Sequence, residues 1–200
     1  MRVPMRTGRP AVAVLALVAA SVLAQERSRI HYKIVAEGSD LRWDLPATLH
    51  TVHGVAPLLS GTIGAEPAAR GEWRIQSRIL VPAGAMTTGN QSRDKKMREK
   101  VLETDRFPEI LFEARHVTAD LSRFPKDEHF TVEVTGDLTV HGKAIRVKLP
   151  VDVFVRPDHV LLQGSFPLAW KQFGLADPSF GLVRVREPLR VRFRLRAVPI

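Results

Sequence analysis

The sequence of 200 residues contains no cysteine, and this absence removes several classes of protein at once. Without a thiol the chain can form no disulfide, carry no lipid on a lipobox cysteine and use no cysteine nucleophile. The chain also lacks the G-x-S-x-G pattern of nucleophilic serines, a P-loop and a glycine-rich dinucleotide-binding turn. These absences argue against the commonest hydrolase reactions, and we expect a binding protein rather than an enzyme.

Basic residues are in excess, but the motifs of nucleic-acid-binding proteins are absent. The chain has 30 Lys and Arg against 21 Asp and Glu, which gives a formal net charge of +9. Nucleic-acid-binding proteins usually concentrate such charge on one patch beside a recognisable motif. Neither a helix-turn-helix pattern nor a basic-aromatic RNA motif is found, so we expect no nucleic-acid partner.

The N-terminus has the features of a signal peptide. Three arginines precede an apolar run of 13 residues at positions 11–23, whereas a membrane-spanning helix needs about 20. Val22 and Ala24 are small residues at the −3 and −1 positions of a signal-peptidase site. We therefore expect a signal peptide over residues 1–24, cleavage after Ala24, and a periplasmic or secreted protein without a transmembrane span in its mature form. An uncleaved N-terminal anchor is the alternative.

The remaining residues, 25–200, are expected to form one domain made of antiparallel strands. Apolar and polar residues alternate over 73–81, over 132–153 with a turn at His141-Gly142, and over 189–196. Further strands are expected near residues 29–36, 40–46, 49–63, 109–120 and 159–168, which makes eight or nine in all. One buried and one solvated face is typical of antiparallel sheets, and closure of the sheet removes its exposed edges. The pattern predicts an all-β protein with a closed barrel.

One segment has helical rather than strand periodicity. From residue 92 to residue 103 the sequence is rich in charge, with Met97, Val101 and Leu102 at helical spacing, and Pro108 prevents a continuation. Asn90 or Ser92 can cap its start. We expect a short amphipathic helix over about 92–103, lying across one end of the barrel. Residues 171–181 are expected to be irregular because they contain two glycines and a proline.

Five sequence blocks occur in an order that resembles a known family. They are HTVHG at 50–54, TTGNQSRDKKM at 87–97, FPEILFEA at 107–114, GDLTVHG at 136–142 and FPLAWKQFGLADPSF at 166–180. This order resembles the YceI-like family of lipid- and polyisoprenoid-binding proteins. The resemblance implies an extended, eight-stranded, lipocalin-like antiparallel barrel with an apolar channel for a long isoprenoid chain. Family members are commonly periplasmic or secreted.

We expect a long apolar lipid to occupy such a channel. A strand of about 12 residues tilted by about 40° spans a barrel about 30 Å tall, which accommodates many isoprene units. The ligand classes compatible with this interior are an isoprenoid quinone, a polyprenol and a fatty acyl chain, and no other cofactor is expected. A barrel filled by its own side chains, in a stress or surface protein with a protein partner, is the alternative. The candidate channel residues are Phe112, Val134, Leu138, Ile145, Leu149, Phe166, Trp170 and Phe193.

Asn90, Arg93 and Asp94 are the best polar candidates, because they lie where a strand gives way to the predicted helix. They can bind the headgroup of a lipid, with Arg93 as the donor, or they can pair with neighbours and fix the helix on the barrel. Charged groups that are partly buried are usually paired, which favours the second interpretation.

His50 and His53 are candidates of a different kind. Residues three apart on a regular strand face opposite sides, so the two imidazoles cannot share one ion without a bulge, and we expect no metal site. A histidine with Asp94 is the only pair that the sequence offers for acid–base catalysis, which is the enzyme alternative. The arginines at positions 190–196 can contact an anionic membrane surface transiently, or form a solvated outer face.

Overall fold

The computed structural model describes residues 30–57, 59–67, 73–118, 129–179 and 182–200. The predicted signal peptide and its cleavage site after Ala24 lie outside the described residues. Within them the chain forms nine strands and four short helical segments. The strands are β1 (Ile30–Leu45), β2 (Val52–Ala56), β3 (Ser60–Pro67), β4 (Trp73–Pro82), β5 (Glu109–Thr118), β6 (His129–Val140), β7 (Lys143–Val155), β8 (Val160–Leu168) and β9 (Leu189–Pro199).

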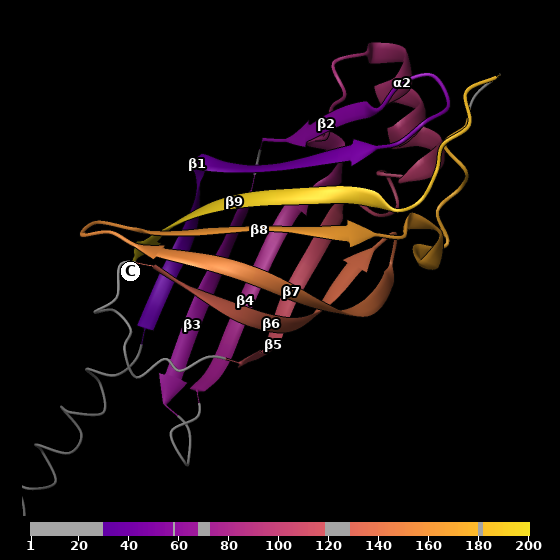
Figure 1. The fold of residues 1–200 in the computed structure, drawn as a ribbon. Coiled ribbons are helices and arrows are strands. Elements are labelled where there is room, and N and C mark those ends of the chain that lie inside the picture. Colours follow the sequence, from indigo (N-terminus) through magenta and orange to yellow (C-terminus); the bar gives the residue numbers. More distant parts are fainter. Residues whose placement is uncertain (1–29, 58, 68–72, 119–128, 180–181) are drawn as a thin grey trace, which may run out of the picture.

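Eight of the strands close into an antiparallel barrel, which confirms the predicted fold class. Strands β3 to β9 pair in sequence order, and β1 pairs with both β3 and β9. The closing β1–β9 ladder extends from Tyr32 opposite Pro199 to Asp44 opposite Arg190. Figure 1 shows the barrel as an elongated body. Closure leaves no long edge exposed, because both ladder edges of each barrel strand are used.

Two of the expected strand boundaries are wrong. Residues 29–36 and 40–46 belong to one strand, β1, which carries a bulge between Val35 and Asp40. Gly38 has a φ of +77°, and the buried Ser39 hydroxyl donates to the Val35 carbonyl and accepts from the Arg196 amide. The side chain of Ser39 therefore replaces ladder bonds that the bulge interrupts, and the strand continues through a polar G-S-D segment.

The segment 49–63, expected as one strand, is two strands on different parts of β1. Strand β2 pairs with the second half of β1, from Leu45 opposite Val52 to Leu41 opposite Ala56. Strand β3 pairs with the first half, from Ile34 opposite Gly61. Pro57 follows β2 and has no amide proton to continue the ladder. Strand β2 therefore extends the sheet only at one end of the barrel.

The expected helix is present and covers that same end. It consists of α2 (Gln91–Lys96) followed directly by the π-helical turn η3 (Met97–Val101). The side chain of Asn90 caps the helix by accepting a 3.0 Å hydrogen bond from the amide of Arg93. Two short 3₁₀ segments, η2 (Ala83–Ala85) and η5 (Trp170–Phe173), complete the helical structure. Within the described part of the chain, none of these helices is long and apolar enough to span a membrane.

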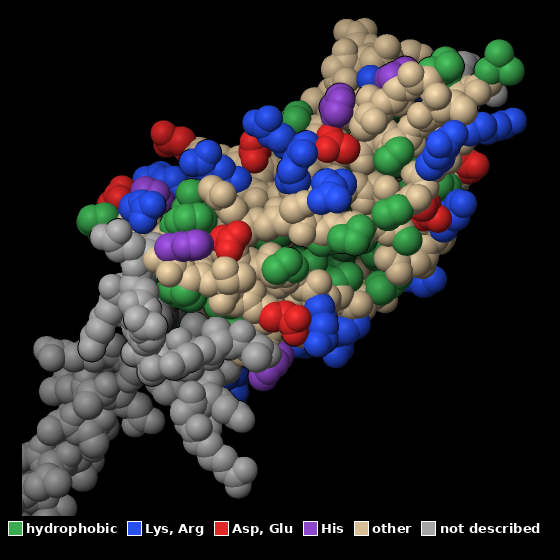
Figure 2. Space-filling view, viewed as in Figure 1, with side chains coloured by type: hydrophobic (Ala, Val, Ile, Leu, Met, Phe, Trp, Pro, Cys, Tyr) green, Lys and Arg blue, Asp and Glu red, His purple; other side chains and the backbone are tan. Residues whose placement is uncertain are grey.

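The helix, β2 and η5 lie together at one end of the barrel, which we call the helix end (Figure 1). The C-terminus and the β7–β8 turn lie at the opposite end, which we call the terminal end. Along β9, Val191 and Leu195 are buried while Arg190, Arg192 and Arg194 are exposed, as the alternation predicts. Charged side chains of both signs are spread over the outer wall (Figure 2). The apolar faces of the strands are therefore left to line the interior.

Candidate functional site

The barrel contains an almost entirely apolar chamber, which we call the inner chamber. Its volume is about 220 Å³, and side chains from all eight barrel strands line it. Tyr32 and Ser77 are its two polar lining residues. Burial in this wall raises the pKa of the Tyr32 phenol. An apolar wall of this kind provides no charged partner for a charged ligand, but it can bury a hydrocarbon chain. Six of the predicted channel residues line it: Phe112, Val134, Leu138, Leu149, Phe166 and Phe193.

A second, larger cavity lies at the helix end, and we call it the outer chamber. Its volume is about 530 Å³. It shares four lining residues with the inner chamber, Leu41, Ile110, Leu138 and Phe166, so the two cavities adjoin at this level of the barrel. Most of its wall is apolar, but five polar side chains also line it: His50, Thr88, Ser92, Arg93 and Lys96. The interior is therefore amphipathic along the barrel axis.

The remaining predicted channel residues lie at or near the outer chamber. Trp170, on η5, lines it and is only 4% exposed. Its indole Nε1 is buried and has no hydrogen-bond partner among the residues that the structure describes. Leaving a buried N–H group without an acceptor destabilises the protein by about 1–3 kcal/mol. A ligand with an acceptor atom beside this N–H would remove that penalty. Ile145 lines neither chamber, because it packs against the cluster of Ala83, Leu102 and Phe173 beside the β6–β7 turn.

Asp94 joins the helix to the segment before it. The carboxylate is 5% exposed and accepts hydrogen bonds from the Thr87 hydroxyl at 2.6 Å, from the Thr88 amide at 2.8 Å and from the Thr88 hydroxyl. Burial disfavours its charged form, but these hydrogen bonds and the nearby Arg98 outweigh burial and lower the pKa of Asp94. Its partners are all on its own segment, and Asp94 lines neither chamber.

Arg93 is bonded to its own segment and also lies at the cavity wall. Its Nε donates to the Thr88 hydroxyl at 2.7 Å, and a terminal nitrogen donates to the Thr88 carbonyl at 3.1 Å. The same side chain lines the outer chamber. These bonds hold the guanidinium in a defined position at the chamber wall, and the planar fork has five N–H donors, of which they use two. Of the three predicted polar residues, the structure places only Arg93 at the cavity.

The two histidines of the HTVHG block have different surroundings. His50 is exposed and lines the outer chamber. His53 points outward from β2, and its Nδ1 lies 2.7 Å from a carboxylate oxygen of Asp44. Asp44 in turn pairs with Arg192 at 2.8 Å. Among the residues that the structure describes, no three His, Cys, Asp or Glu side chains are grouped so that they could hold a metal ion.

Two segments complete the wall of the outer chamber, and the sequence singles out only the second half of one of them. Residues 46–51 and 182–187 lie side by side, joined by an isolated bridge between Ala47 and Val185. Val183 and Val185 line the chamber, whereas Arg184 and Arg186 are exposed. Apolar and basic residues alternate over 183–186 in the sequence, but this alternation is too short to identify a strand. Lys96 contributes a cross-link, because its Nζ donates to the Ser179 carbonyl at 2.8 Å.

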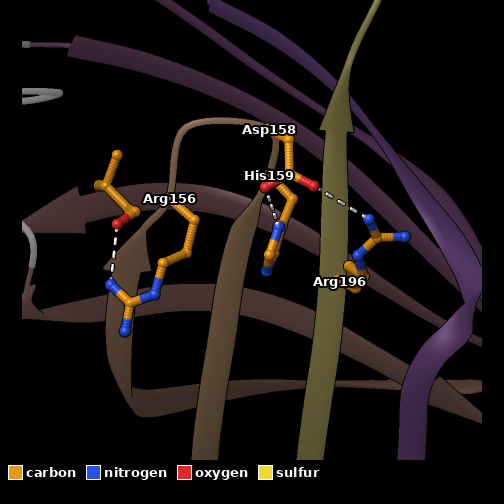
Figure 3. Close-up of polar contacts among 5 residues, drawn as sticks. Arg156, Asp158, His159 and Arg196 are labelled. Atoms are coloured by element: carbon orange, nitrogen blue, oxygen red, sulfur yellow. Dashed lines mark hydrogen bonds and ion pairs between the residues drawn. The ribbon is translucent and has the colours of Figure 1, made fainter.

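The terminal end has a different polar character. In the β7–β8 turn, Asp158 accepts from His159 at 2.8 Å and lies 3.5 Å from Arg196 on β9 (Figure 3). The hydrogen bond from His159 and the nearby Arg196 lower the pKa of Asp158, which is a surface carboxylate. Arg156 donates to the neighbouring Val155 carbonyl. None of the four residues labelled in Figure 3 lines a chamber.

Comparison with known proteins identifies relatives of this chain. The profile of the YceI-like domain matches residues 32–197. No curated protein sequence matches the chain. Among solved structures, a polyisoprenoid-binding domain from Saccharophagus degradans implicated in plant cell wall breakdown has a TM-score of 0.69 and 18% identity, over 86% of this chain and 99% of that chain.

Two further structures have the same fold. BcnA from Burkholderia cenocepacia has a TM-score of 0.66 at 17% identity, over 82% of this chain and 99% of that chain. The YceI protein from Campylobacter jejuni has a TM-score of 0.56 at 14% identity, over 76% of this chain and 86% of that chain. At these identities the similarity establishes the shared barrel.

Proposed function

Because this chain belongs to the family of YceI-like domains, we propose that it is an exported carrier that holds one long apolar lipid inside its barrel. The observation that carries the proposal is the pair of adjoining chambers, with an inner wall that is apolar and an outer wall that is partly polar. Pockets for small molecules typically measure about 300–1,000 Å³ and combine apolar walls with a few polar groups. The name of the Saccharophagus relative, a polyisoprenoid-binding domain, supports the same class of ligand.

The different chemistry of the two chambers supports one orientation for the lipid. The hydrocarbon tail occupies the inner chamber, where each buried CH₂ group contributes about 0.8 kcal/mol. The headgroup stays in the outer chamber, next to Arg93 and the unpartnered indole N–H of Trp170. Both are donors, so they favour a headgroup with acceptor oxygens, which an isoprenoid quinone, a polyprenol and a fatty acid all possess.

The export part of the proposal depends on the sequence of residues 1–24. A basic leader, an apolar run and small residues before position 25 support cleavage after Ala24 and delivery to the periplasm or the medium. N-terminal sequencing of the protein recovered outside the cytoplasm is expected to begin at Gln25. Recovery with Met1 intact would contradict cleavage without affecting the carrier role.

The carrier proposal is tested by what the protein contains when it is purified without detergent. Extraction with organic solvent, followed by mass spectrometry, is expected to release a lipid with a long isoprenoid or acyl chain in near-equal molar ratio to the protein. Protein treated in the same way after unfolding and refolding without lipid provides the blank. An empty extract, together with failure to take up a dansyl-labelled geranylgeraniol from detergent micelles, would rule out the carrier role and favour a barrel without a ligand.

A further inference from the structure

The wall of the outer chamber has a projecting apolar and basic margin, made of residues 46–51 and 182–187, which we call the rim. The Thr48 amide donates to the Arg184 carbonyl at 2.9 Å, and the Arg184 amide donates back to the Thr48 hydroxyl at 2.7 Å. The Arg186 amide donates to the Pro46 carbonyl at 2.8 Å. These bonds tie the two segments of the rim together.

The rim carries large apolar side chains that contact water. Leu182 is 92% exposed and Leu49 is 75% exposed. Only two other large hydrophobic side chains are exposed in the described part of the chain: Val55, on β2 at the helix end, and Ile200, at the terminal end. Apolar side chains gathered beside a cavity and surrounded by polar residues are typical of a surface that binds a partner or a membrane.

The charge around the rim is basic. Residues 86–107, 169–179 and 182–190, which together with residues 46–51 and β2 make up much of the helix end, contain ten Lys and Arg against six Asp and Glu. One of those acids, Asp94, is buried and does not face the solvent. Arg184 and Arg186 are exposed on the rim itself, and basic and hydrophobic side chains are both visible at this end in Figure 2. A basic surface that carries apolar side chains complements a membrane with anionic headgroups.

We propose that the rim docks onto the surface of an anionic lipid bilayer. Leu49 and Leu182 insert at the boundary between headgroups and acyl chains, while Arg184 and Arg186 contact lipid phosphates. The inference rests on the proposed carrier function, because it specifies where the carrier collects or delivers its lipid. It differs from a contact made by the arginines of β9, which lie on the barrel wall, where Arg192 pairs with Asp44.

The rim adjoins the outer chamber, so docking by the rim would bring the bilayer next to the cavity. Val183, Val185 and His50 belong to the rim and also line the outer chamber. A bilayer in contact with Leu49 and Leu182 therefore lies against the cavity in which the headgroup is held. A lipid that passes between the bilayer and the chamber by this route exposes little of its hydrocarbon chain to water.

The first experiment measures binding to vesicles of phosphatidylcholine with and without phosphatidylglycerol, by co-sedimentation. All variants share one N-terminus, so any contribution from the leader is the same in each. Leu182→Ser is expected to weaken binding to the anionic vesicles about tenfold, and the double variant with Leu49→Ser about thirtyfold. Ile200→Ser is the matched control, because it removes a large apolar side chain that is 73% exposed at the terminal end, and it is expected to bind like the unmodified protein.

The basic contribution is tested with a second matched pair. Arg184→Gln combined with Arg186→Gln is expected to weaken binding to phosphatidylglycerol vesicles about tenfold, and to leave the weak binding to phosphatidylcholine unchanged. Arg156→Gln combined with Arg194→Gln removes the same charge from the terminal end and the barrel wall. This control is expected to weaken binding to phosphatidylglycerol vesicles by less than about threefold.

Loading with dansyl-labelled geranylgeraniol separates failure of docking from failure of the carrier function. From detergent micelles, the unmodified protein and the double leucine variant are expected to load equally; from anionic vesicles, the variant is expected to load about tenfold more slowly. If the unmodified protein and the double leucine variant bind vesicles equally, docking by the rim is overturned. It is also overturned if the unmodified protein binds no vesicles but self-associates, and the double leucine variant does not self-associate. If neither protein loads from micelles, the carrier function itself fails.

Discussion

Arg93 and Asp94 are adjacent on one helix but have different surroundings. Arg93 and Asp94 follow each other on α2, and both form hydrogen bonds with Thr88. Asp94 is enclosed by its own segment, whereas Arg93 lies against the outer chamber. Loss of either residue would therefore disturb the 87–94 segment, but only the loss of Arg93 would change the polar wall that faces a ligand.

Asp94→Asn is expected to lower the free energy of unfolding at pH 7 by about 1–3 kcal/mol, because the amide satisfies the Thr87, Thr88 and backbone donors less well than a carboxylate. The pKa of Asp94 is lower in the folded protein than its ordinary value of about 3.9 in an unfolded chain. The stabilisation is therefore present above pH 4 and is lost as the pH falls through the lower, folded pKa.

Urea denaturation at pH 7 and at about pH 3 measures this contribution, and the difference between the two proteins should shrink at the lower pH. Asp137→Asn is the comparison, since Asp137 is a surface carboxylate whose pKa is lowered by Arg146 and Arg115. Surface ion pairs contribute little, so its effect should be smaller. An Asp94→Asn variant as stable as the unmodified protein would show that the carboxylate does not hold the helix.

Trp170→Phe tests the unpartnered indole N–H. An aromatic ring is kept at this position although the indole is lost, so the stability of the lipid-free protein should change by less than about 1.5 kcal/mol. Release of a bound lipid should become about three- to tenfold faster, because one donor to its headgroup is lost. Dissociation of the dansyl-labelled prenol into excess acceptor vesicles provides the measurement. Trp170→Phe is compared with Trp43→Phe, which alters another tryptophan of the same chamber whose Nε1 is not among the unpartnered buried atoms. A release rate for Trp170→Phe equal to that of the unmodified protein would exclude Trp170 as a headgroup donor.

At the scale of the elements, strand β2 is held in place by a close approach to β1. Gly54 lies opposite Trp43 in the β1–β2 ladder, and the indole packs directly over the glycine. A Cβ atom at position 54 would lie 2.1 Å from Trp43 Cζ2. Trp43 also lines the outer chamber, so this contact connects the HTVHG block with the shape of the cavity. The glycine of that block therefore serves packing.

Gly54→Ala is expected to destabilise the protein by about 1–3 kcal/mol, because the Trp43 ring must move to accommodate the methyl group. The displaced ring would also change the outer chamber and slow uptake of the prenol probe. Thermal denaturation measures the loss of stability, and intrinsic tryptophan emission reports the displacement of the Trp43 ring. Gly84→Ala is the matched control, since a Cβ there meets nothing within 4 Å. Equal melting temperatures for the two variants would contradict the close packing of Trp43 on Gly54.

For the whole molecule, the important feature is that two chambers of different chemistry adjoin inside one closed barrel. Four residues line both chambers, and one of them, Leu138, lies on β6. A long chain must pass this level to use both cavities. For the proposed carrier, the length of lipid that fits is therefore expected to depend on side chains at the junction more than on headgroup contacts.

Leu138→Trp is expected to narrow the junction and shift the preference of the protein towards shorter prenols, at a cost in stability of about 1–3 kcal/mol. Competition between prenols of increasing length against the dansyl probe gives the preference directly. Leu111→Trp adds the same bulk to a residue outside the lining of either chamber, and should leave the length preference unchanged. A preference that is identical in both variants would show that the tail does not pass Leu138.

The sequence alone determined the class of fold, because alternation of apolar and polar side chains is a local property of a strand with one buried face. The alternation of Val191, Leu195 and the arginines between them predicted the face of β9 that lies inside, and the spacing of Met97 and Val101 predicted the helix. The order of five sequence blocks identified the family.

Only the tertiary structure decided which residues share the cavity. The alternation places a side chain inside or outside but does not give its height along the barrel axis, so Ile145 was expected in the channel although it packs beside the β6–β7 turn. Residues 46–51 and 182–187 are separated by more than 130 positions and meet through hydrogen bonds such as Thr48 to Arg184. A rim built in this way depends on closure of the barrel, which brings distant segments together, and no short-range pattern records it.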